Sequence, residues 1–219
     1  MIRTLDPDER AAVVRVLSEA FADYPVMRFV LGGDPMEMPD GLAALVGFFT
    51  DVRYAMGWPV LGVEADGRLV AATLVNEPTD APFLDRFQDG LARVRAALGE
   101  EAYARLEAFE HASEGNEPDG DYYFMGMLGV LPGYQRQGFG RMLLRHVEAM
   151  ASDAGCGVAL STEDARNVPF YEDLGYRVIG QADIGELHTW GFYRPADAGG
   201  SSRSGAAPPS LSEPTPSEE

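Results

Sequence analysis

The sequence has a single cysteine, no long apolar run and few basic residues for its size. One cysteine excludes an internal disulfide framework, and the place of Cys156 between two glycines predicts a buried structural thiol rather than a nucleophile. No run of about 18 apolar residues occurs, and the first residues lack the basic and then apolar pattern of a secretory signal. From these absences we expect a soluble cytoplasmic protein with no membrane partner.

Acidic residues outnumber basic ones, with 35 Asp and Glu against 17 Lys and Arg and a formal net charge of -18. Residues 196–219 contribute only -3 of this, from one Asp and three Glu against one Arg. An acidic surface repels nucleic acid, so we expect no nucleic-acid partner. The same field would attract a protonated amine, although an acidic surface needs no such function. A polyanionic ligand would need local groups that act against the overall charge.

The length of 219 residues and the hydrophobic content of 46% suit one sizeable core. We therefore predict one domain over residues 1–195. From residue 196 the chain is rich in Ser, Gly, Ala and Pro with scattered acids, a composition that predicts a disordered acidic tail over 196–219. The composition leaves a monomer and a homodimer equally open.

In the first half of the chain, apolar residues at helical spacing predict helices over residues 13–21, 41–56, 84–98 and 103–109. Asp6-Pro7-Asp8 would cap the first of them, and the segment that begins at Tyr24-Pro25 is predicted to be a loop. Two apolar runs, 60–64 and 69–75, flank Asp66-Gly67 and predict a hairpin. A loop rich in glycine and acids is predicted over 111–121.

In the second half, the apolar run 122–130 predicts a central strand that is covered on both faces. An amphipathic pattern then predicts a helix over 139–154, which Gly155 would end. Further predicted elements are a strand over 157–161, a short helix over 167–174 and strands over 176–179 and 187–193. This order of elements is typical of an α/β fold with a mixed sheet.

The segment 130–141 predicts an anion-binding site, because it joins the central strand to the long helix through a glycine-rich loop. Gly138 and Gly140 let the backbone approach a ligand closely, and the unpaired amides of a first helical turn favour an anion. A pyrophosphate would fit such a site. Positive charge there would come from three arginines: Arg136, Arg141 and Arg145.

Two common phosphate-binding motifs do not match this loop. Gly133 and Gly138 have the spacing of a Walker A loop, but Phe139 and Gly140 stand where a lysine and a hydroxyl residue are needed. Gly138-x-Gly140 could begin a dinucleotide fingerprint, but Leu143 occupies the third glycine position. Another nucleotide-binding α/β protein is therefore a weaker hypothesis.

Two segments resemble the GNAT acetyltransferases. Gln135-x-x-Gly138-x-Gly140 is similar to that family's Gln/Arg-x-x-Gly-x-Gly/Ala loop between a central strand and a long helix. Residues 167–176, Asn-Val-Pro-Phe-Tyr-Glu-Asp-Leu-Gly-Tyr, resemble the family's segment in which an asparagine precedes a tyrosine and then Gly-Phe. The resemblance covers 122–193 and is closest to small-molecule and antibiotic N-acetyltransferases. It implies a GNAT fold: a central mixed, mostly antiparallel sheet flanked by helices, with a helical insertion before the central strand.

The resemblance also implies which residues hold acetyl-CoA. Main-chain groups of the central strand would pair with the pantetheine arm, the loop amides would hold the pyrophosphate, and Asn167 would bond the pantetheine region. Tyr171 would be the general acid, because amine attack on a thioester needs one donor at the carbonyl oxygen and another at the sulfur. The implied cofactor-binding residues, with no metal among the ligands, are Met127, Leu128, Gly129, Val130, Gln135, Arg136, Gln137, Gly138, Phe139, Gly140, Arg141, Asn167, Phe170 and Tyr171.

Several of these residues also have ordinary structural explanations. An aromatic residue on a short helix, such as Tyr171, usually belongs to the core. Asn167 could cap its helix and Gly175 could end it. His188 lies on a late strand where related enzymes line the acceptor pocket, but a strand histidine is more often an ordinary structural residue.

The general base and the acceptor cannot be identified from the sequence. Glu163 and Asp164 follow a strand end and Asp121 precedes the central strand, but a chain of waters would serve as well. The acid that relatives often carry near the position of Ser161 is missing. We expect an acetyl-CoA-dependent N-acetyltransferase that acts directly on an amine of a small molecule or peptide. Its acceptor cleft would be closed by residues 24–31 and the helices of 83–110, and the alternative is a non-catalytic acyl-CoA-binding regulatory module.

Overall fold

The chain folds around one seven-stranded sheet with the strand order β1-β2-β3-β4-β5-β7-β6. The computed structural model describes residues 1–79 and 84–196. Neighbouring strands pair antiparallel, except β4 and β5, which are parallel. The strands are β1 (Ile2–Thr4), β2 (Val60–Ala65), β3 (Arg68–Asn76), β4 (Tyr122–Val130), β5 (Gly157–Thr162), β6 (Arg177–Ile184) and β7 (Leu187–Arg194). The helices are α1 (Arg10–Phe21), α2 (Pro25–Leu31), α3 (Pro39–Met56), α4 (Leu84–Leu98), α5 (Glu100–Ser113), α6 (Phe139–Asp153) and α7 (Val168–Asp173).

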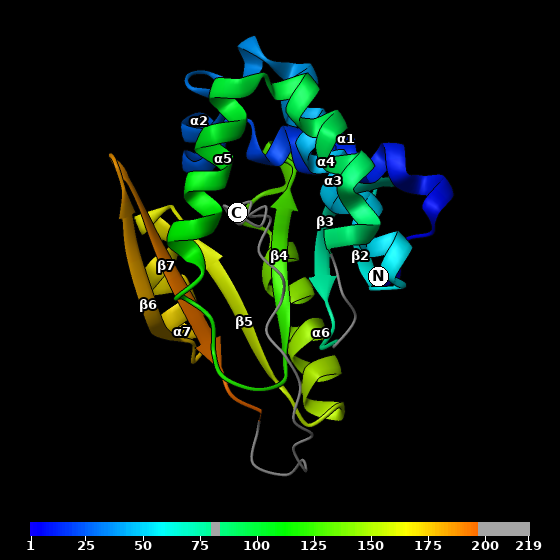
Figure 1. Cartoon of the computed structure of the whole chain (residues 1–219). Helices are drawn as coiled ribbons and strands as arrows, with labels where there is room; N and C mark the ends of the chain where they lie inside the picture. Colours follow the sequence, from blue (N-terminus) through cyan, green and yellow to red (C-terminus); the bar gives the residue numbers. More distant parts are fainter. Residues whose placement is uncertain (80–83, 197–219) are drawn as a thin grey trace.

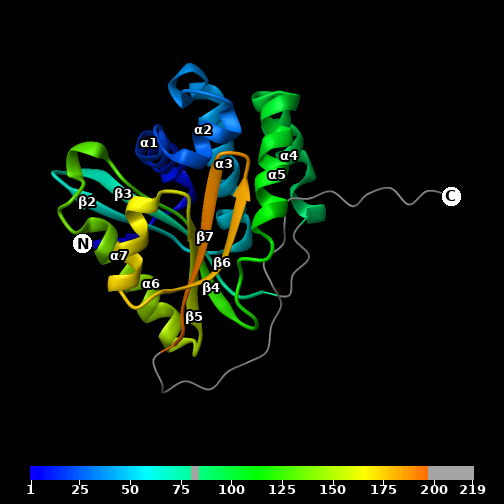
Figure 2. The ribbon, with the colours of Figure 1, turned by 90° about the vertical axis from the view of Figure 1, so that its left-hand side faces the viewer.

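Helices cover both faces of the sheet (Figures 1 and 2). α1 packs against β3 and β4 on one face, and α6 packs across β2 to β5 on the other. Each face has its own apolar cluster. On α6, Leu143 and Leu144 are completely buried, and replacing either by alanine would cost about 2–5 kcal/mol. The predicted mixed, mostly antiparallel sheet with flanking helices is confirmed.

β4 is the central strand, as predicted, and its side chains serve both clusters. Met125 belongs to the cluster under α6, and Met127 to the cluster under α1 and α3. β4 pairs with β3 along most of its length, but with β5 only from Tyr122 to Met125. Beyond Met125 the two parallel strands diverge (Figure 1). Within the described chain, residues 126–130 therefore have a strand neighbour on the β3 side alone.

The pairing of β3 with β4 slips at Gly126. Leu74 pairs with Met127 while Val75 pairs with Met125, so Gly126 is the extra residue of a β-bulge. A Cβ atom at Gly126 would lie 2.7 Å from Nη2 of Arg53 on α3, closer than real Cβ contacts allow. A side chain at this position would therefore displace the Arg53 guanidinium, and the bulge lies where β4 and β5 separate.

Most of the other predicted elements are confirmed with shifted boundaries. The β2–β3 hairpin turns at Asp66 and Gly67, which both have a positive φ, as a two-residue hairpin turn of this kind requires. The helical insertion before β4 consists of α4 and α5, and α5 extends beyond the predicted 103–109 at both ends. β6 continues to Ile184 instead of ending at 179, because it pairs with β7 along its length.

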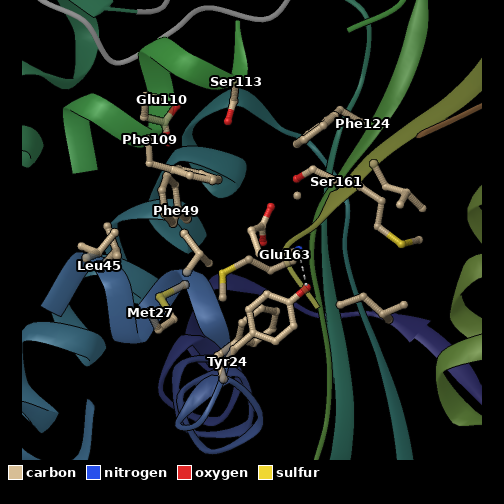
Figure 3. A pocket seen from close by; sticks show the side chains of 18 of the residues that line it. Tyr24, Met27, Leu45, Phe49, Phe109, Glu110, Ser113, Phe124, Ser161 and Glu163 are labelled. Atoms are coloured by element: carbon tan, nitrogen blue, oxygen red, sulfur yellow. Dashed lines mark hydrogen bonds between the residues drawn. The ribbon is translucent and has the colours of Figure 1, made fainter. Parts of the chain in front are cut away.

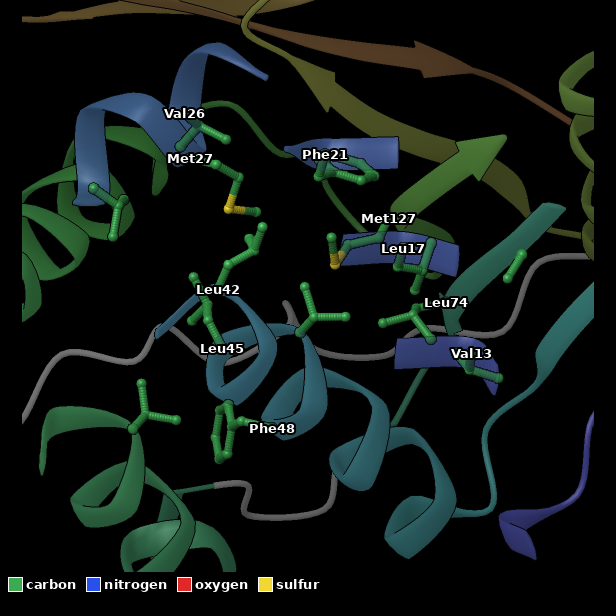
Figure 4. Packing of buried hydrophobic residues seen from close by; sticks show 14 of the residues in the cluster. Val13, Leu17, Phe21, Val26, Met27, Leu42, Leu45, Phe48, Leu74 and Met127 are labelled. Carbon is green, nitrogen blue, oxygen red and sulfur yellow. The ribbon is translucent and has the colours of Figure 1, made fainter. Parts of the chain in front are cut away.

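The prediction of a loop between the first two predicted helices is wrong, because residues 25–31 form the helix α2. Pro25 occupies the first helical turn, where its missing amide hydrogen costs nothing, and Gly32 ends the helix with a φ of 78°. Val26 and Met27 point into the apolar cluster toward α1 and α3 (Figure 4). A helix of seven residues is too short for periodicity to reveal, and tertiary packing stabilises it.

The structure differs from the sequence-based predictions in three smaller points. Asp6 caps the short 3-10 turn Pro7–Glu9 rather than α1, and the Glu9 carboxylate accepts a hydrogen bond from the Asp6 amide at 3.1 Å. β1 was not predicted, since three residues carry no periodic signal. Cys156 is half-buried rather than buried; burial and the nearby Asp121 raise the pKa of its thiol, which disfavours the reactive thiolate.

The predicted acidic tail, 196–219, lies outside the described residues from 197 onward, so the domain boundary stays a prediction. None of the helices that the structure describes has the length and apolar character that a bilayer crossing requires.

Candidate active site

The predicted anion-binding loop forms the connection between β4 and α6. A 3-10 turn, Pro132–Tyr134, follows the strand, and Gly138 in the left-handed region (φ 87°) leads into α6 at Phe139. Arg136 also has a positive φ, 60°, which is uncommon for a residue with a side chain. A Cβ atom at Gly138 would meet no atom within 4 Å, so the space in front of this glycine is open.

The main-chain amides of this loop are available to a ligand. Within residues 1–79 and 84–196, no acceptor is bonded to the amides of 135–141, whereas the amide of Tyr134 donates to Leu131 O at 2.8 Å and that of Met142 to Gly138 O at 2.9 Å. Side-chain amides brace the loop instead: Gln135 donates to Val130 O at 3.3 Å, and Gln137 to Gly133 O at 3.4 Å. Unbonded amides at the start of a 15-residue helix are suited to an anion.

The three arginines predicted for this site differ in their surroundings. Arg136 is exposed on the loop. Arg141 is exposed at the start of α6, with its guanidinium 5.7 Å from the ring centroid of Phe170 on α7. Arg145 is a turn further along and pairs with Glu148 at 2.8 Å, a carboxylate that Arg194 also approaches at 3.3 Å. That Arg145 adds charge to the loop stays a prediction.

A cavity of about 410 Å³ lies where β4 and β5 diverge (Figure 3). Four of the predicted site residues line it: Met127, Leu128, Asn167 and Tyr171. Gly129, Val130, the loop 135–141 and Phe170 are not part of its lining. The other walls come from α1, α2, α3 and α5, together with the chain that follows α5. Of the two helices predicted to close the acceptor cleft, only α5 contributes described residues to the lining.

Tyr171 lines this cavity and is buried, with 9% of its surface exposed. Its ring packs against Phe170, Tyr176 and Phe192, with centroid separations of 5.3, 6.0 and 5.4 Å. Burial, assisted by the charge of Glu163, raises the pKa of its phenol, so the hydroxyl keeps its proton at neutral pH. Within the described chain this hydroxyl has no hydrogen-bond partner, which leaves its proton available to a ligand.

Asn167 lines the cavity but does not cap α7. Its side-chain amide donates to Thr162 Oγ1 at 3.1 Å, and the helix has no side-chain cap hydrogen bond. The capping explanation for Asn167 is therefore wrong, whereas Gly175, with a φ of 88°, does follow the end of α7.

Glu163 is the cavity residue whose role the sequence did not reveal. It follows β5, is 8% exposed and points its carboxylate into the cavity (Figure 3). Thr189 Oγ1 donates to Glu163 Oε1 at 2.9 Å, and no basic group of the described chain pairs with it. Burial raises the pKa of Glu163 to about 7, although the hydroxyls of Thr189 and Ser161 oppose the rise. A carboxyl group with this pKa can exchange a proton near neutral pH.

Tyr24 connects the N-terminal helices to the end of β5. Its hydroxyl shares a hydrogen bond of 2.7 Å with Thr162 Oγ1 and accepts one from the main-chain amide of Glu163 at 3.3 Å (Figure 3). Desolvation raises the pKa of the Tyr24 phenol, and the charge of Glu163 adds to the rise. This hydrogen bond thus holds together two cavity-lining residues that are 139 positions apart in the sequence.

The cavity is lined by further charged side chains. Glu110, Glu114 and Glu117, from α5 and the chain after it, line the cavity together with Arg53 of α3. Burial raises the pKa of Glu110 to about 7, while Arg53 acts against the rise. Burial lowers the pKa of Arg53 to about 10, so the guanidinium stays charged.

His188, considered as an acceptor-site residue, does not line the cavity. Its ring contacts the Asp183 carboxylate at 2.5 Å and the Gln181 side chain at 3.2 Å on the β6–β7 hairpin. The interpretation of His188 as an ordinary strand residue agrees with this placement.

Comparison with known proteins gives one family and many similar folds. A family model described as "Acetyltransferase (GNAT) family" matches residues 48–176, more than half of the chain. A Corynebacterium glutamicum structure described as histone acetyltransferase HPA2 and related acetyltransferase superposes with a TM-score of 0.69 at 19% identity, over 91% of this chain and 97% of that one.

Two insect enzymes have a similar fold. The polyamine N-acetyltransferase of Drosophila melanogaster gives a TM-score of 0.57 at 16% identity, over 89% of this chain and 99% of that one. Arylalkylamine N-acetyltransferase 2 of Aedes aegypti gives 0.60 at 14% identity, over 90% and 99%. At these identities the likeness concerns the fold.

Proposed function

Because the chain belongs to the acetyltransferase (GNAT) family, we propose that it transfers an acetyl group from acetyl-CoA directly to an amine of a small molecule or peptide. The observation that carries this proposal is the run of unbonded main-chain amides at 135–141, which ends at the first turn of α6. These amides offer a pyrophosphate the donors that it needs, in a chain whose net charge would otherwise repel it.

The residues around the cavity fit the rest of acetyl-CoA. Residues 126–130 have main-chain groups without a strand partner on the β5 side, and these can pair with the amides of the pantetheine arm. Asn167 borders the same gap at the end of β5, where its side chain can bond the arm as well. We propose that the cofactor-binding residues are the same fourteen that the family resemblance implied from the sequence.

The chemistry requires a neutral amine and a proton for the leaving group. Acetyl-CoA supplies a thioester, whose carbonyl carbon forms a bond to the amine nitrogen while its bond to sulfur breaks. Glu163 accepts the proton that the ammonium must lose, since its pKa of about 7 leaves a large ionised fraction at neutral pH. After the attack, Tyr171 donates its phenolic proton to the thiolate, and the nitrogen, which must lose a second proton to become an amide, returns one to the phenolate. An amide of 126–130 on the side facing away from β3 stabilises the oxyanion.

The acceptor would occupy the cavity between Glu163 and the wall of α5. The volume of about 410 Å³ is in the range of small-molecule sites. The insect relatives named above act on polyamines and arylalkylamines, which supports a small amine rather than a large antibiotic.

Ligand binding provides the first test. Acetyl-CoA, ATP and NAD are compared by thermal shift, and acetyl-CoA alone is expected to raise the melting temperature. At a hundredfold excess over its dissociation constant, a ligand stabilises a protein by about 2.7 kcal/mol. Stabilisation by ATP and not by acetyl-CoA would refute the proposed cofactor.

Turnover provides the second test. Release of free thiol from acetyl-CoA is measured with a panel of amines, for the wild type and for Tyr171→Phe. We expect the variant to keep its acetyl-CoA-dependent thermal shift and to lose about 10²–10⁴-fold in kcat. Binding of acetyl-CoA with no turnover for any amine would instead favour the non-catalytic acyl-CoA-binding module.

A further inference from the structure

The charged groups around the acceptor cavity are unbalanced. Four carboxylates line it, those of Glu110, Glu114, Glu117 and Glu163, against the single guanidinium of Arg53. If Glu163 serves the reacting amine, the α5 side still has three carboxylates against one guanidinium. In the free protein, protons neutralise part of this excess, since the pKa values of Glu110 and Glu163 are both about 7.

The carboxylates on the α5 side also repel one another. The charges of Glu117, Glu163 and Glu114 all raise the pKa of Glu110, in addition to the effect of burial. Arg53 reduces this repulsion, but it makes no ion pair with Glu110 within 4.0 Å among the described residues. Instead its Nη1 donates to Phe49 O at 3.1 Å, and its guanidinium lies 5.7 Å from the Phe49 ring centroid. A cation bound beside Glu110 would relieve the remaining repulsion.

Independent evidence for a cationic ligand comes from the pairing of these carboxylates. Tyr122 donates to the Glu117 carboxylate at 2.8 Å and His111 lies 3.4 Å from that of Glu114, whereas Glu110 has no hydrogen bond or ion pair among the described residues. An ammonium group carries three donors and would give the Glu110 carboxylate a partner. Figure 3 shows Ser113 and Glu110 on the same side of the cavity, away from Glu163.

Apolar side chains lie between the two polar ends. Phe49 and Phe109 separate Glu110 from the region of Glu163 and Tyr24 in Figure 3, with Phe124 on the other side. Such walls suit an aliphatic chain, and aromatic ring faces also attract a cation.

From this arrangement we propose that the acceptor is a linear amine with a second positive charge, whose reacting nitrogen lies at Glu163 and whose distal ammonium lies at Glu110. The proposal deepens the proposed function and rests on it. A zwitterionic acceptor, with a carboxylate near Arg53, is the competing possibility, but it would meet three carboxylates on that side.

The test compares acceptors of equal chain length. A series of α,ω-diamines is assayed against the matching n-alkylamines and ω-amino acids, with kcat/KM from thiol release. We expect the best diamine to exceed its alkylamine by at least about tenfold, the size of a specific polar contact. Equal kcat/KM for diamine and alkylamine, or a preference for the ω-amino acid, would overturn the proposal.

Glu110→Gln tests the residue, with Glu101→Gln as its control. Both variants remove one carboxylate from α5, but Glu101 is exposed in the first turn and does not line the cavity. The preference for the diamine should fall about tenfold in Glu110→Gln and stay unchanged in Glu101→Gln. An equal preference in both variants would show that Glu110 does not bind the second charge.

Calorimetry separates this inference from the proposed function. Binding of the diamine and of the alkylamine to the wild type, in the presence of coenzyme A, needs no turnover. Tighter binding of the diamine without thiol release would support the second cation site and refute the proposed activity. Equal affinity and equal turnover of diamine and alkylamine would refute the second cation site and leave the proposed activity supported.

Discussion

Replacing Glu163 by glutamine should make the protein more stable and much less active. The carboxyl group has a pKa of about 7 in the folded protein, against an ordinary value of 4.5. At 1.36 kcal/mol per pH unit, this difference corresponds to about 3 kcal/mol of stability that the ionised group costs. Glutamine stays neutral and keeps an oxygen that can accept from Thr189, so it removes the cost and retains the contact.

The sign of the pH dependence follows from the raised pKa. Below pH 4.5 the carboxyl group is protonated in the folded and in the unfolded chain, and the two proteins should differ little. Between pH 4.5 and 7 the unfolded chain ionises first, so the wild type loses stability relative to the variant. Above pH 7 the full cost of about 3 kcal/mol applies as an upper limit.

The measurement is thermal unfolding of wild type and Glu163→Gln at pH 5.5 and pH 8.5. For a chain of this size, 1 kcal/mol corresponds to roughly 2–4 °C. The variant should melt several degrees higher at pH 8.5, with a smaller difference at pH 5.5. In parallel, kcat/KM should fall by about 10²–10⁴-fold, because the substitution removes the proposed base.

Asp164→Asn is the matched control. Asp164 is the next residue, does not line the cavity, and has its pKa lowered chiefly by the hydrogen bond from Arg166. Since Asp164 is ionised in both states across this range, its replacement should shift the melting temperature equally at pH 5.5 and 8.5. A stability difference for Glu163→Gln that does not grow with pH would refute the raised pKa. Activity within tenfold of the wild type would refute the role as base.

Three further predictions concern the frame of the site. Tyr24→Phe removes the hydrogen bonds to Thr162 and to the Glu163 amide. We expect the free energy of unfolding in urea to fall by about 1–3 kcal/mol and the pH–rate profile to shift. An unchanged pH–rate profile would show that Tyr24 does not position Glu163. Gly138→Ala forces a side chain into the left-handed region and should lower the free energy of unfolding by about 1–2 kcal/mol. Gly140→Ala should be neutral or stabilising, because no atom lies nearer than 3.7 Å to the added Cβ. Equal losses of stability in the two variants would contradict the conformational argument. Gly126→Ala places a Cβ atom 2.7 Å from Arg53 Nη2 and should destabilise the fold by about 1–3 kcal/mol. If the same loss of stability is measured in an Arg53→Ala background, the contact with Arg53 is not its cause.

The sequence by itself determined the elements that local patterns encode. The apolar run 122–130 specified a central strand, the 3.6-residue period after Phe139 specified α6, and the glycines between them specified a loop with open amides. These features depend on residues that are neighbours in the chain, so periodicity and backbone preference suffice to predict them. Short elements such as α2 escaped, because seven residues give too little pattern and packing stabilises them.

Only the tertiary structure decided the chemistry of the acceptor side. Glu163, Tyr24 and Glu110 come from three separate parts of the chain, and no local pattern brings them to one cavity. The pKa of Glu163 is raised by burial among those distant walls, and Tyr24 reaches its amide across 139 positions. Burial and electrostatic repulsion are properties of the assembled fold, which is why Glu163 could not be distinguished from Asp164 in the sequence, while in the structure it alone of the two faces the cavity.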